Sequence, residues 1–343
     1  MFDFSSIKHD LFSSKEYRAL RIIIHNINKM DLRLTDYTVL TEVGSNNYVY
    51  APIIAALSGA DKVYAWTADT QHGLGNAIAA QCADIAYRLG VKNRIEFCIN
   101  KRDMSHVECA NIITNSGFVR PIESQFVKRI NPDRCVVPLM YEAWELRDSD
   151  IDITACKKKK VRIAGTWESH PDLKVFQGTG QLAVKLALDA GFEVYRNKIA
   201  VWSDDEFGQV AKAAFENAGA SNVALISDRN ELLKRLPSLD FVYFCDYFGR
   251  IPLVSQNGIL QPEDIKSLNP GLGVVHLFGE LDANFCRSEN IDFYPKKSGS
   301  AEQMTETLAY LGPDPVLSLT VAGLKVGQIL LSGEINPLAQ SII

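Results

Sequence analysis

Residues 38–67 read TVLTEVGSNNYVYAPIIAALSGADKVYAWT, and this stretch indicates the fold class. Its first run, TVLTEV at 38–43, and its last run, KVYAWT at 62–67, are rich in β-branched and aromatic residues, which favour strands. Gly44 follows the first run, and the apolar segment 51–60 between the runs has a helical composition. A strand, a glycine turn, a helix and a second strand in this order are typical of a parallel β-α-β unit.

The same alternation of strands and helices continues along most of the chain. Further strand-like runs lie at 94–99, 110–114, 134–138, 161–165, 198–202, 222–227, 240–245 and 273–278. A charged, aromatic stretch at 141–150 separates two such series, and four lysines follow it at 157–160. We therefore predict an α/β protein with two Rossmann-like domains, each a doubly wound parallel sheet, and a cleft between them.

The N-terminal part is expected to form a helical arm outside the first sheet. Ser13 and Glu16 fit a capping box at the start of a helix over 14–29. Its apolar residues recur at helical spacing and are Leu20, Ile23, Ile24 and Ile27. Such a stripe must be covered, either by its own domain or by a second subunit.

Four parts are expected along the chain. They are an N-terminal helical arm (1–35), a first α/β domain that is Rossmann- or flavodoxin-like (36–150), a second α/β domain (151–315), and a C-terminal helix that packs back across the domains (316–343).

The composition excludes several classes of protein. Apolar residues make up 47% of the chain and charged residues 22%, which is typical of a soluble globular protein. With 36 basic against 41 acidic residues the net charge is −5, so no nucleic-acid partner is expected. The seven cysteines never have C-x-x-C spacing, which predicts neither a zinc site nor a disulfide framework. Without a secretory leader or an apolar run of about 20 residues, we expect a cytoplasmic protein with no membrane contact.

Three segments resemble the D-2-hydroxyacid dehydrogenase family. The segment RDSDIDITACKKKKVRIAGT (147–166) contains Asp150-Ile151-Asp152, which is similar to the helix start that ends the family's first domain. The segment 198–220 looks like the family's strand and phosphate turn, and 258–282 looks like its later helix, Pro-Gly and last strand. The resemblance implies that the second domain binds NAD or NADP and that the protein is a homodimer.

The phosphate turn departs from the family's glycine-rich pattern. Its three glycine positions fall at Ser203, Asp205 and Gly208, so only the last glycine is present. Asp204, Asp205 and Glu206 place three carboxylates where a pyrophosphate would bind, which is electrostatically adverse. The same carboxylates suit the N-terminus of a helix, where they would cap it and interact favourably with its dipole.

Other positions expected to contact a cofactor also have structural explanations. Asp228 lies where the family holds a ribose and Arg229 where a 2′-phosphate would be bound, yet Asp228 is equally a helix N-cap. Arg250 follows strand 240–245 and could bind an anion. The cofactor therefore stays open between NAD, NADP and none.

The family's catalytic residues are only partly represented. Its substrate-binding arginine falls at Phe278 or Gly279, and its catalytic Pro-His pair appears as Pro295-Lys296. Lys296 and His170, which follows strand 161–165, are the candidate catalytic residues. His276 lies among apolar residues and is expected to be a core histidine.

The first domain has a pattern of its own. Glu42, Gly44 and, after the next strand, Asp69 are similar to positions of S-adenosylmethionine-dependent methyltransferases, although any strand-to-helix turn also favours a glycine. Three functions remain. The favoured one is a dehydrogenase-derived protein that binds a small ligand, or a protein or peptide partner, in the cleft without hydride transfer. The alternatives are a divergent NAD(P)-dependent oxidoreductase and a methyltransferase-like enzyme.

Overall fold

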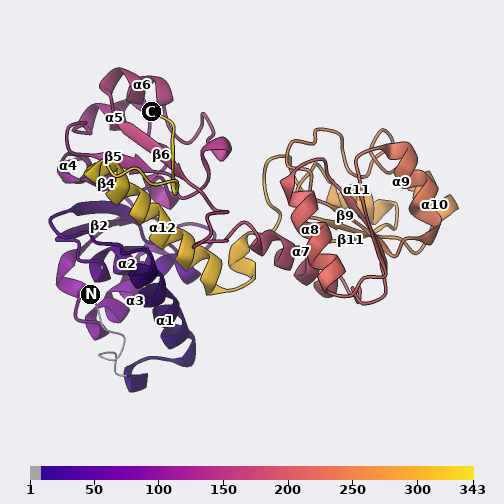
Figure 1. The fold of residues 1–343 in the computed structure, drawn as a ribbon, viewed down its shortest axis with the longest axis horizontal. Helices are drawn as coiled ribbons and strands as arrows, with labels where there is room; N and C mark the ends of the chain where they lie inside the picture. Colours follow the sequence, from indigo (N-terminus) through magenta and orange to yellow (C-terminus); the bar gives the residue numbers. More distant parts are fainter. Residues whose placement is uncertain (1–8) are drawn as a thin grey trace. The chain divides into compact units, whose positions relative to one another are not determined.

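The structure is a computed structural model that describes residues 9–343, and it divides into two compact units. Unit 1 contains the described residues up to Val175 together with Pro313–Ile343, and unit 2 is Phe176–Gly312 (Figure 1). Each unit is a β-sheet with helices on both faces, so the predicted α/β class with two Rossmann-like sheets is confirmed.

Unit 1 is built on a seven-stranded sheet. Its strands are β1 (Thr38–Glu42), β2 (Lys62–Thr67), β3 (Ile95–Ile99), β4 (Ile112–Ile113), β5 (Val136–Pro138), β6 (Arg162–Thr166) and β12 (Ala339–Ser341). They are ordered β3-β2-β1-β4-β5-β6-β12, and only the edge strand β12 is antiparallel to its neighbour. The six parallel strands have the order typical of dinucleotide-binding Rossmann domains.

Alternate residues of these strands pack against different helices, because successive side chains of a strand point to opposite faces. Val39 of β1 packs into the core on one face and Leu40 into the core on the other. The first face is covered by α1 (Ser14–Lys29), α2 (Ala51–Leu57), α3 (Gly75–Arg88) and α12 (Pro313–Ser332). The second is covered by α4 (Met104–Cys109), α5 (Ser124–Arg129) and α6 (Ile153–Lys159).

Unit 2 is a smaller, wholly parallel sheet with a different strand order. Its strands are β7 (Lys198–Trp202), β8 (Asn222–Ile226), β9 (Phe241–Phe244), β10 (Gly273–His276) and β11 (Asp292–Tyr294). They are ordered β8-β7-β9-β10-β11, which is the flavodoxin-like order. One face is covered by α7 (Gly178–Asp189) and α8 (Glu206–Asn217), the other by α9 (Arg229–Arg235), α10 (Pro262–Leu268) and α11 (Ala283–Ser288).

Short 3₁₀ helices complete the connections. They are η2 (His9–Leu11), η3 (Asn46–Tyr50), η4 (Lys92–Arg94), η5 (Gly117–Val119), η6 (Ala143–Glu145), η7 (Leu236–Ser238) and η8 (Leu308–Tyr310).

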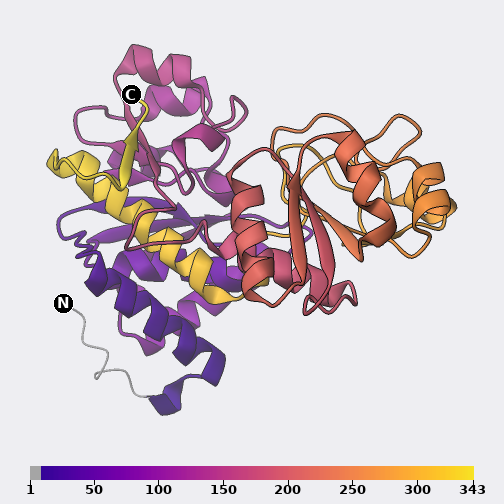
Figure 2. The same ribbon diagram turned by 45° about the vertical axis from the view of Figure 1, so that its right-hand side comes forward.

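The N-terminal helix forms where the sequence predicts it and is part of unit 1. The capping box of Ser13 and Glu16 is present, and α1 covers Ser14–Lys29. Helix α1 lies beside α12 (Figure 2), and its apolar stripe is buried. Asn26 Nδ2 donates to Ser318 Oγ of α12 at 3.0 Å. The stripe is therefore covered within the chain.

The C-terminal segment differs from the prediction of one helix packed across both domains. Its helix α12 begins at Pro313 and packs on β5 and β6 of unit 1, and residues 339–341 form a strand instead. The helix is long and apolar enough to cross a membrane, but most of it is buried in the core of unit 1. Its hydropathy thus reflects core packing.

The boundary between the sheets also lies later than the expected residue 150. The predicted strand 161–165 forms as β6, and it pairs with β5 of unit 1 through Ile163 opposite Val137. Gly165 lets the segment Glu142–Ala143 pass close to β6, since a Cβ there would lie 2.3 Å from the Ala143 amide nitrogen. The second sheet begins only at β7. The sequence of a strand does not specify which strand it pairs with, so this boundary could not be placed from the sequence.

Candidate functional site

Asp205 occupies the helix N-terminus at the strand-order reversal of unit 2, between β7 and β9. Its Oδ1 accepts hydrogen bonds from the Ser203 hydroxyl at 2.7 Å and the Phe207 N–H at 2.9 Å. Its Oδ2 accepts one from the Tyr247 N–H, in the loop after β9, at 2.8 Å. Open α/β sheets bind ligands at such a reversal, and a pyrophosphate would need the N–H groups of the helix N-terminus, such as that of Phe207. In this chain an internal carboxylate takes them.

Gly208 is retained for packing. A Cβ at this position would lie 2.6 Å from the Ser203 Cβ and 2.8 Å from the Leu225 side chain. The last glycine of the dinucleotide fingerprint has the same role, which is to let a helix approach a strand closely. Gly208 therefore does not by itself indicate a bound cofactor.

The surroundings of Asp205 are acidic. Burial raises the pKa of Asp246, which follows β9, and the nearby carboxylates of Asp204 and Asp205 raise it further. These carboxylates repel one another, and they would also repel the negative charge of a bound phosphate.

Asp228 and Arg229 have structural partners. Asp228 caps α9 and accepts a hydrogen bond from the Glu231 N–H at 2.9 Å. Arg229 donates to Asp264 at 2.6 Å and to the Ile259 carbonyl at 3.1 Å, which ties α9 to α10. The N-cap alternative for Asp228 thus describes its observed contact, and Arg229 already has a carboxylate partner.

Arg250 and Lys296 likewise form ion pairs within unit 2. Arg250 pairs with Glu302 and donates to the Phe248 carbonyl at 2.9 Å. The Lys296 ammonium lies 2.7 Å from Asp292 and over the Phe293 ring. Both side chains are more than half exposed.

The eight predicted site residues are divided between the units. His170 belongs to unit 1, where its Nδ1 accepts the Asp172 N–H at 3.2 Å and its ring stacks edge-on against Trp167. The other seven belong to unit 2, and of these the structure brings Ser203, Asp205 and Gly208 together. His276 is a buried core residue, and burial lowers its pKa to about 4.

Unit 1 has its own strand-order reversal, between β1 and β4, and a set of polar side chains gathers there. We call it the switch-point group: Glu42, Asn115, Ser116, Arg120, Tyr141 and Asp150. Glu42 ends β1, and Asn115 and Ser116 closely follow β4. Parallel strands end at the same edge of a sheet, which explains the gathering.

The pKa of Glu42, in this group, is strongly raised. Burial raises its pKa to about 7, although the positive charge of Arg120 and a hydrogen bond with Ser116 both oppose the rise. Room for the carboxyl comes from Gly117, whose φ is +45°, because a Cβ there would lie 1.7 Å from Glu42 Oε2. A side chain at residue 117 would displace the carboxyl.

On the other side of the group, donors exceed acceptors. The Tyr141 hydroxyl donates to Asp150 at 2.7 Å, and Arg120 reaches the same Asp150 oxygen at 3.4 Å. Asn115 is 1% exposed; its Oδ1 accepts the Met140 N–H at 2.9 Å. Its Nδ2 has no acceptor among residues 9–343. A buried amide without a partner is costly, so this donor needs an acceptor.

Arg102 holds the loop that carries Arg120. Its guanidinium donates to the Phe118 carbonyl at 3.0 Å, to the Pro121 carbonyl at 3.0 Å and to the carbonyl of Arg120. Three carbonyls on one planar donor fix the backbone of this loop.

Three carboxyls lie beyond β5 and β6. Glu142 accepts hydrogen bonds from the Glu168 N–H at 2.8 Å and from the Trp144 indole at 2.7 Å. Burial, with the charges of Glu145 and Glu142, raises the pKa of Glu168 well above its usual range, and burial raises that of Glu145 to about 7. The pKa shifts of Glu145 and Glu168 thus both favour the protonated carboxyl.

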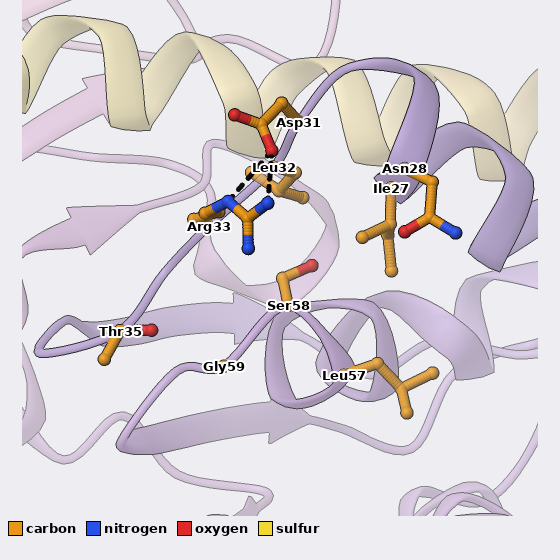
Figure 3. A pocket seen from close by; sticks show the side chains of 9 residues that line it. All are labelled: Ile27, Asn28, Asp31, Leu32, Arg33, Thr35, Leu57, Ser58 and Gly59. Carbon is orange, nitrogen blue, oxygen red and sulfur yellow. Dashed lines mark hydrogen bonds and ion pairs between the residues drawn. The ribbon is translucent and has the colours of Figure 1, made fainter. Parts of the chain in front are cut away.

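Figure 3 shows a small pocket of about 120 Å³ at the opposite edge of the unit 1 sheet. Its residues lie on α1, on the segment before β1 and on the segment before β2, and Arg33 in it is paired with Asp31 at 2.8 Å. Open α/β sheets bind ligands at the carboxyl ends of strands, so this pocket is not the candidate site.

Sequence reasoning missed most of the switch-point group. The sequence analysis includes Glu42 in a methyltransferase-like pattern and Asp150 in a helix start, and it assigns no role to Asn115, Arg120 or Tyr141. The available signal was that Asn115 and Tyr141 follow predicted strands, and side chains there face a sheet's ligand-binding edge.

Comparison with solved structures concerns the fold. The dipicolinate synthase A chain from Bacillus subtilis matches with a TM-score of 0.55 and 11% identity, over 89% of this chain and 100% of that one. The same subunit from Bacillus halodurans matches at 0.52 and 11% (87% and 98%), and the pyruvate reductase of Chlamydomonas reinhardtii at 0.51 and 10% (89% and 99%).

The chain has a two-domain dehydrogenase-like fold. The two-domain architecture that the resemblance implies is thereby confirmed, at sequence identities of 10–11%. No protein-family model and no curated protein sequence matches the chain.

Proposed function

We propose that this chain is a dehydrogenase-derived protein that binds a small ligand and does not transfer hydride. The observation that carries the proposal is the Asp205 carboxylate, which accepts the N–H groups of Phe207 and Tyr247. A pyrophosphate at this place would have to displace a carboxylate from its hydrogen bonds and then lie beside it.

The substrate side supports the same proposal. The dehydrogenase arginine that would bind a substrate carboxylate corresponds to Phe278, which is 1% exposed, or to Gly279, whose φ of +103° favours glycine. Lys296, at the position of the catalytic histidine, is paired with Asp292. Without these two groups a 2-oxo acid has neither its anchor nor its usual proton donor.

The ligand of this proposal binds at the switch-point group of unit 1. That group combines a carboxyl of raised pKa, an arginine and a buried donor without a partner, at a strand-order reversal. Perturbed titratable groups at such an edge are characteristic of ligand sites. The ligand is a small molecule or the end of a peptide.

The test compares Asp205→Asn with a matched control, Asp282→Asn, which alters the N-cap of α11 in the same unit. Calorimetry measures NAD and NADP affinity, and NADH absorbance follows turnover with 2-oxo and 2-hydroxy acids. We expect no turnover by the unaltered chain, and a gain in cofactor affinity only for Asp205→Asn. Turnover by the unaltered chain would establish the alternative, a divergent NAD(P)-dependent oxidoreductase.

A methyltransferase-like function is the second candidate, and one observation favours it. Unit 1, with Gly44 after β1, has the strand order of nucleotide-binding domains, and Asp69 follows β2. The Asp69 carboxylate already accepts the Gly75 N–H at 2.8 Å and the Asn100 amide at 3.0 Å, which fixes its position. Calorimetry with S-adenosylmethionine tests this candidate.

A homodimer in the cytoplasm, without nucleic acid, completes the proposal. The net charge of −5 argues against a nucleic-acid partner, and the homodimer rests on the dimers common in the resembled family. Light scattering on the purified chain measures its mass, and a monomer would contradict the dimer.

A further inference from the structure

The Glu42 side of the switch-point group presents a carboxyl. Its carboxyl is withdrawn from water, interacts with Ser116, and lies in the space that Gly117 leaves open. Tyr48 borders it, since the Glu42 charge helps raise the pKa of that phenol. The charge of Arg120 and the hydrogen bond with Ser116 only partly offset the burial of this carboxyl, and a ligand ammonium group would add positive charge and donors.

The Arg120 side of the same group has more hydrogen-bond donors than acceptors. The Arg120 guanidinium donates to Asp150 at 3.4 Å, and because its side chain is 36% exposed, others of its five N–H donors are accessible to a ligand. The Asn115 amide is buried near the Tyr141 hydroxyl, and its Nδ2 has no acceptor within hydrogen-bond distance among residues 9–343. A carboxylate on a ligand would satisfy both kinds of donor.

We propose that the switch-point group binds a ligand through an α-amino acid group, with the ammonium at Glu42 and the carboxylate at Arg120 and Asn115. Arg120 acts on Glu42 electrostatically and contacts Asp150, so it lies between the two acids. Glu42, which would bind an ammonium group, therefore lies next to Arg120 and Asn115, which would bind a carboxylate. The ammonium and carboxylate of an amino acid are neighbours in the same way. This inference rests on the proposed small-ligand function and names the ligand's class.

Other ligand classes fit the group less well. A phosphate would lie between the carboxylates of Glu42 and Asp150 and would be repelled by both. A simple amine would satisfy Glu42 but leave the Asn115 amide without an acceptor. A simple carboxylic acid would bind Arg120 and leave Glu42 without a donor.

The test uses thermal unfolding of the full chain with the free L-amino acids at about 10 mM, since a ligand that binds the folded state raises its melting temperature. S-adenosylhomocysteine is compared with 5′-methylthioadenosine, which lacks the amino acid group. Each amino acid that binds is compared with its deaminated and decarboxylated counterparts. The variants are Glu42→Gln and Arg120→Gln, with the exposed Glu334→Gln as the control.

We expect at least one amino acid, or S-adenosylhomocysteine, to raise the melting temperature, and its deaminated and decarboxylated counterparts to have no effect. Titration should show an affinity at least about tenfold weaker in Glu42→Gln and Arg120→Gln, and unchanged in Glu334→Gln. The unliganded melting temperature of each variant shows whether it folds.

Absence of binding by every probe would overturn this inference, and so would equal binding of compounds that lack the ammonium or carboxylate. Neither result bears on NAD exclusion, which the Asp205 experiment decides separately. Conversely, NAD turnover would contradict the proposed absence of hydride transfer, and the amino acid measurements on unit 1 would stand unchanged.

Discussion

The Tyr247 backbone N–H donates to the Asp205 carboxylate at 2.8 Å and so ties the loop after β9 to the N-terminus of α8. The two elements flank the strand-order reversal of unit 2. A dinucleotide-binding domain keeps this place open for a pyrophosphate. Here the same N–H groups stabilise the fold instead.

Replacing Asp205 should therefore destabilise unit 2. Asp205→Ala removes the acceptor of the Ser203 hydroxyl and of two backbone N–H groups, and we expect a loss of about 2–3 kcal/mol in the free energy of unfolding. Asp282→Ala, which removes only the α11 cap, should lose about 1 kcal/mol. Urea denaturation measures both, and equal losses would show that the Tyr247 contact contributes nothing.

Glu42→Gln should change how stability depends on pH. Because the pKa of Glu42 is raised to about 7 in the folded chain, the folded state binds more protons than the unfolded state between pH 4.5 and about 7. Ionised Glu42 therefore lowers stability as pH rises through this range. At about 1.4 kcal/mol per pKa unit, Glu42→Gln should be more stable than the native chain by about 1–3 kcal/mol at pH 8, and equal to it at pH 4.

Denaturation at the two pH values measures this difference. Glu334→Gln, at an exposed position, should follow the native chain at both. A Glu42→Gln curve parallel to that of the native chain would show that the Glu42 carboxyl is solvated.

Gly208→Ala should be strongly destabilising although the change is small. The added Cβ would lie 2.6 Å from the Ser203 Cβ, so α8 must move away from β7. We expect a loss of about 2–3 kcal/mol, as for other overpacked positions. Gly271→Ala is the control, because its Cβ would meet no atom closer than 3.7 Å and its φ is unstrained. Thermal unfolding that shows equal effects would refute the close packing.

Leu20→Ala tests whether α1 is part of the unit 1 core. Leu20 is fully buried in the cluster that contains α12, so its truncation should cost about 2–4 kcal/mol. Leu188→Ala, on α7, should cost less than about 1 kcal/mol because that side chain is 55% exposed. A negligible effect of Leu20→Ala, measured by urea denaturation, would contradict the observed packing of α1.

Local features of the fold were predictable from the sequence because they depend on neighbouring residues. The Ser13–Glu16 capping box and the strands after Tyr37 and Asp61 form as expected, and Asp228 caps its helix. Asp205 was recognised as a possible cap, and it is one. Hydrogen bonds over two or three residues and the periodicity of apolar side chains determine such features.

Features that depend on distant pairing were not predictable. The strand at 161–165 looks the same whether it begins a second sheet or joins the first, and only its pairing with β5 decides. The switch-point group is assembled by the order of β1, β4 and β5, which brings Glu42 near Arg120 across more than seventy residues of chain. The composition of the chain and the spacing of its residues do not predict that strand order.

Calorimetric titration of the native chain with NAD and NADP tests the central claim most directly. Because the Asp205 carboxylate holds the N–H groups that a pyrophosphate needs, we predict no binding of either nucleotide with a dissociation constant below about 10 µM. A dissociation constant below about 10 µM for either would contradict the account and restore unit 2 as a working cofactor domain.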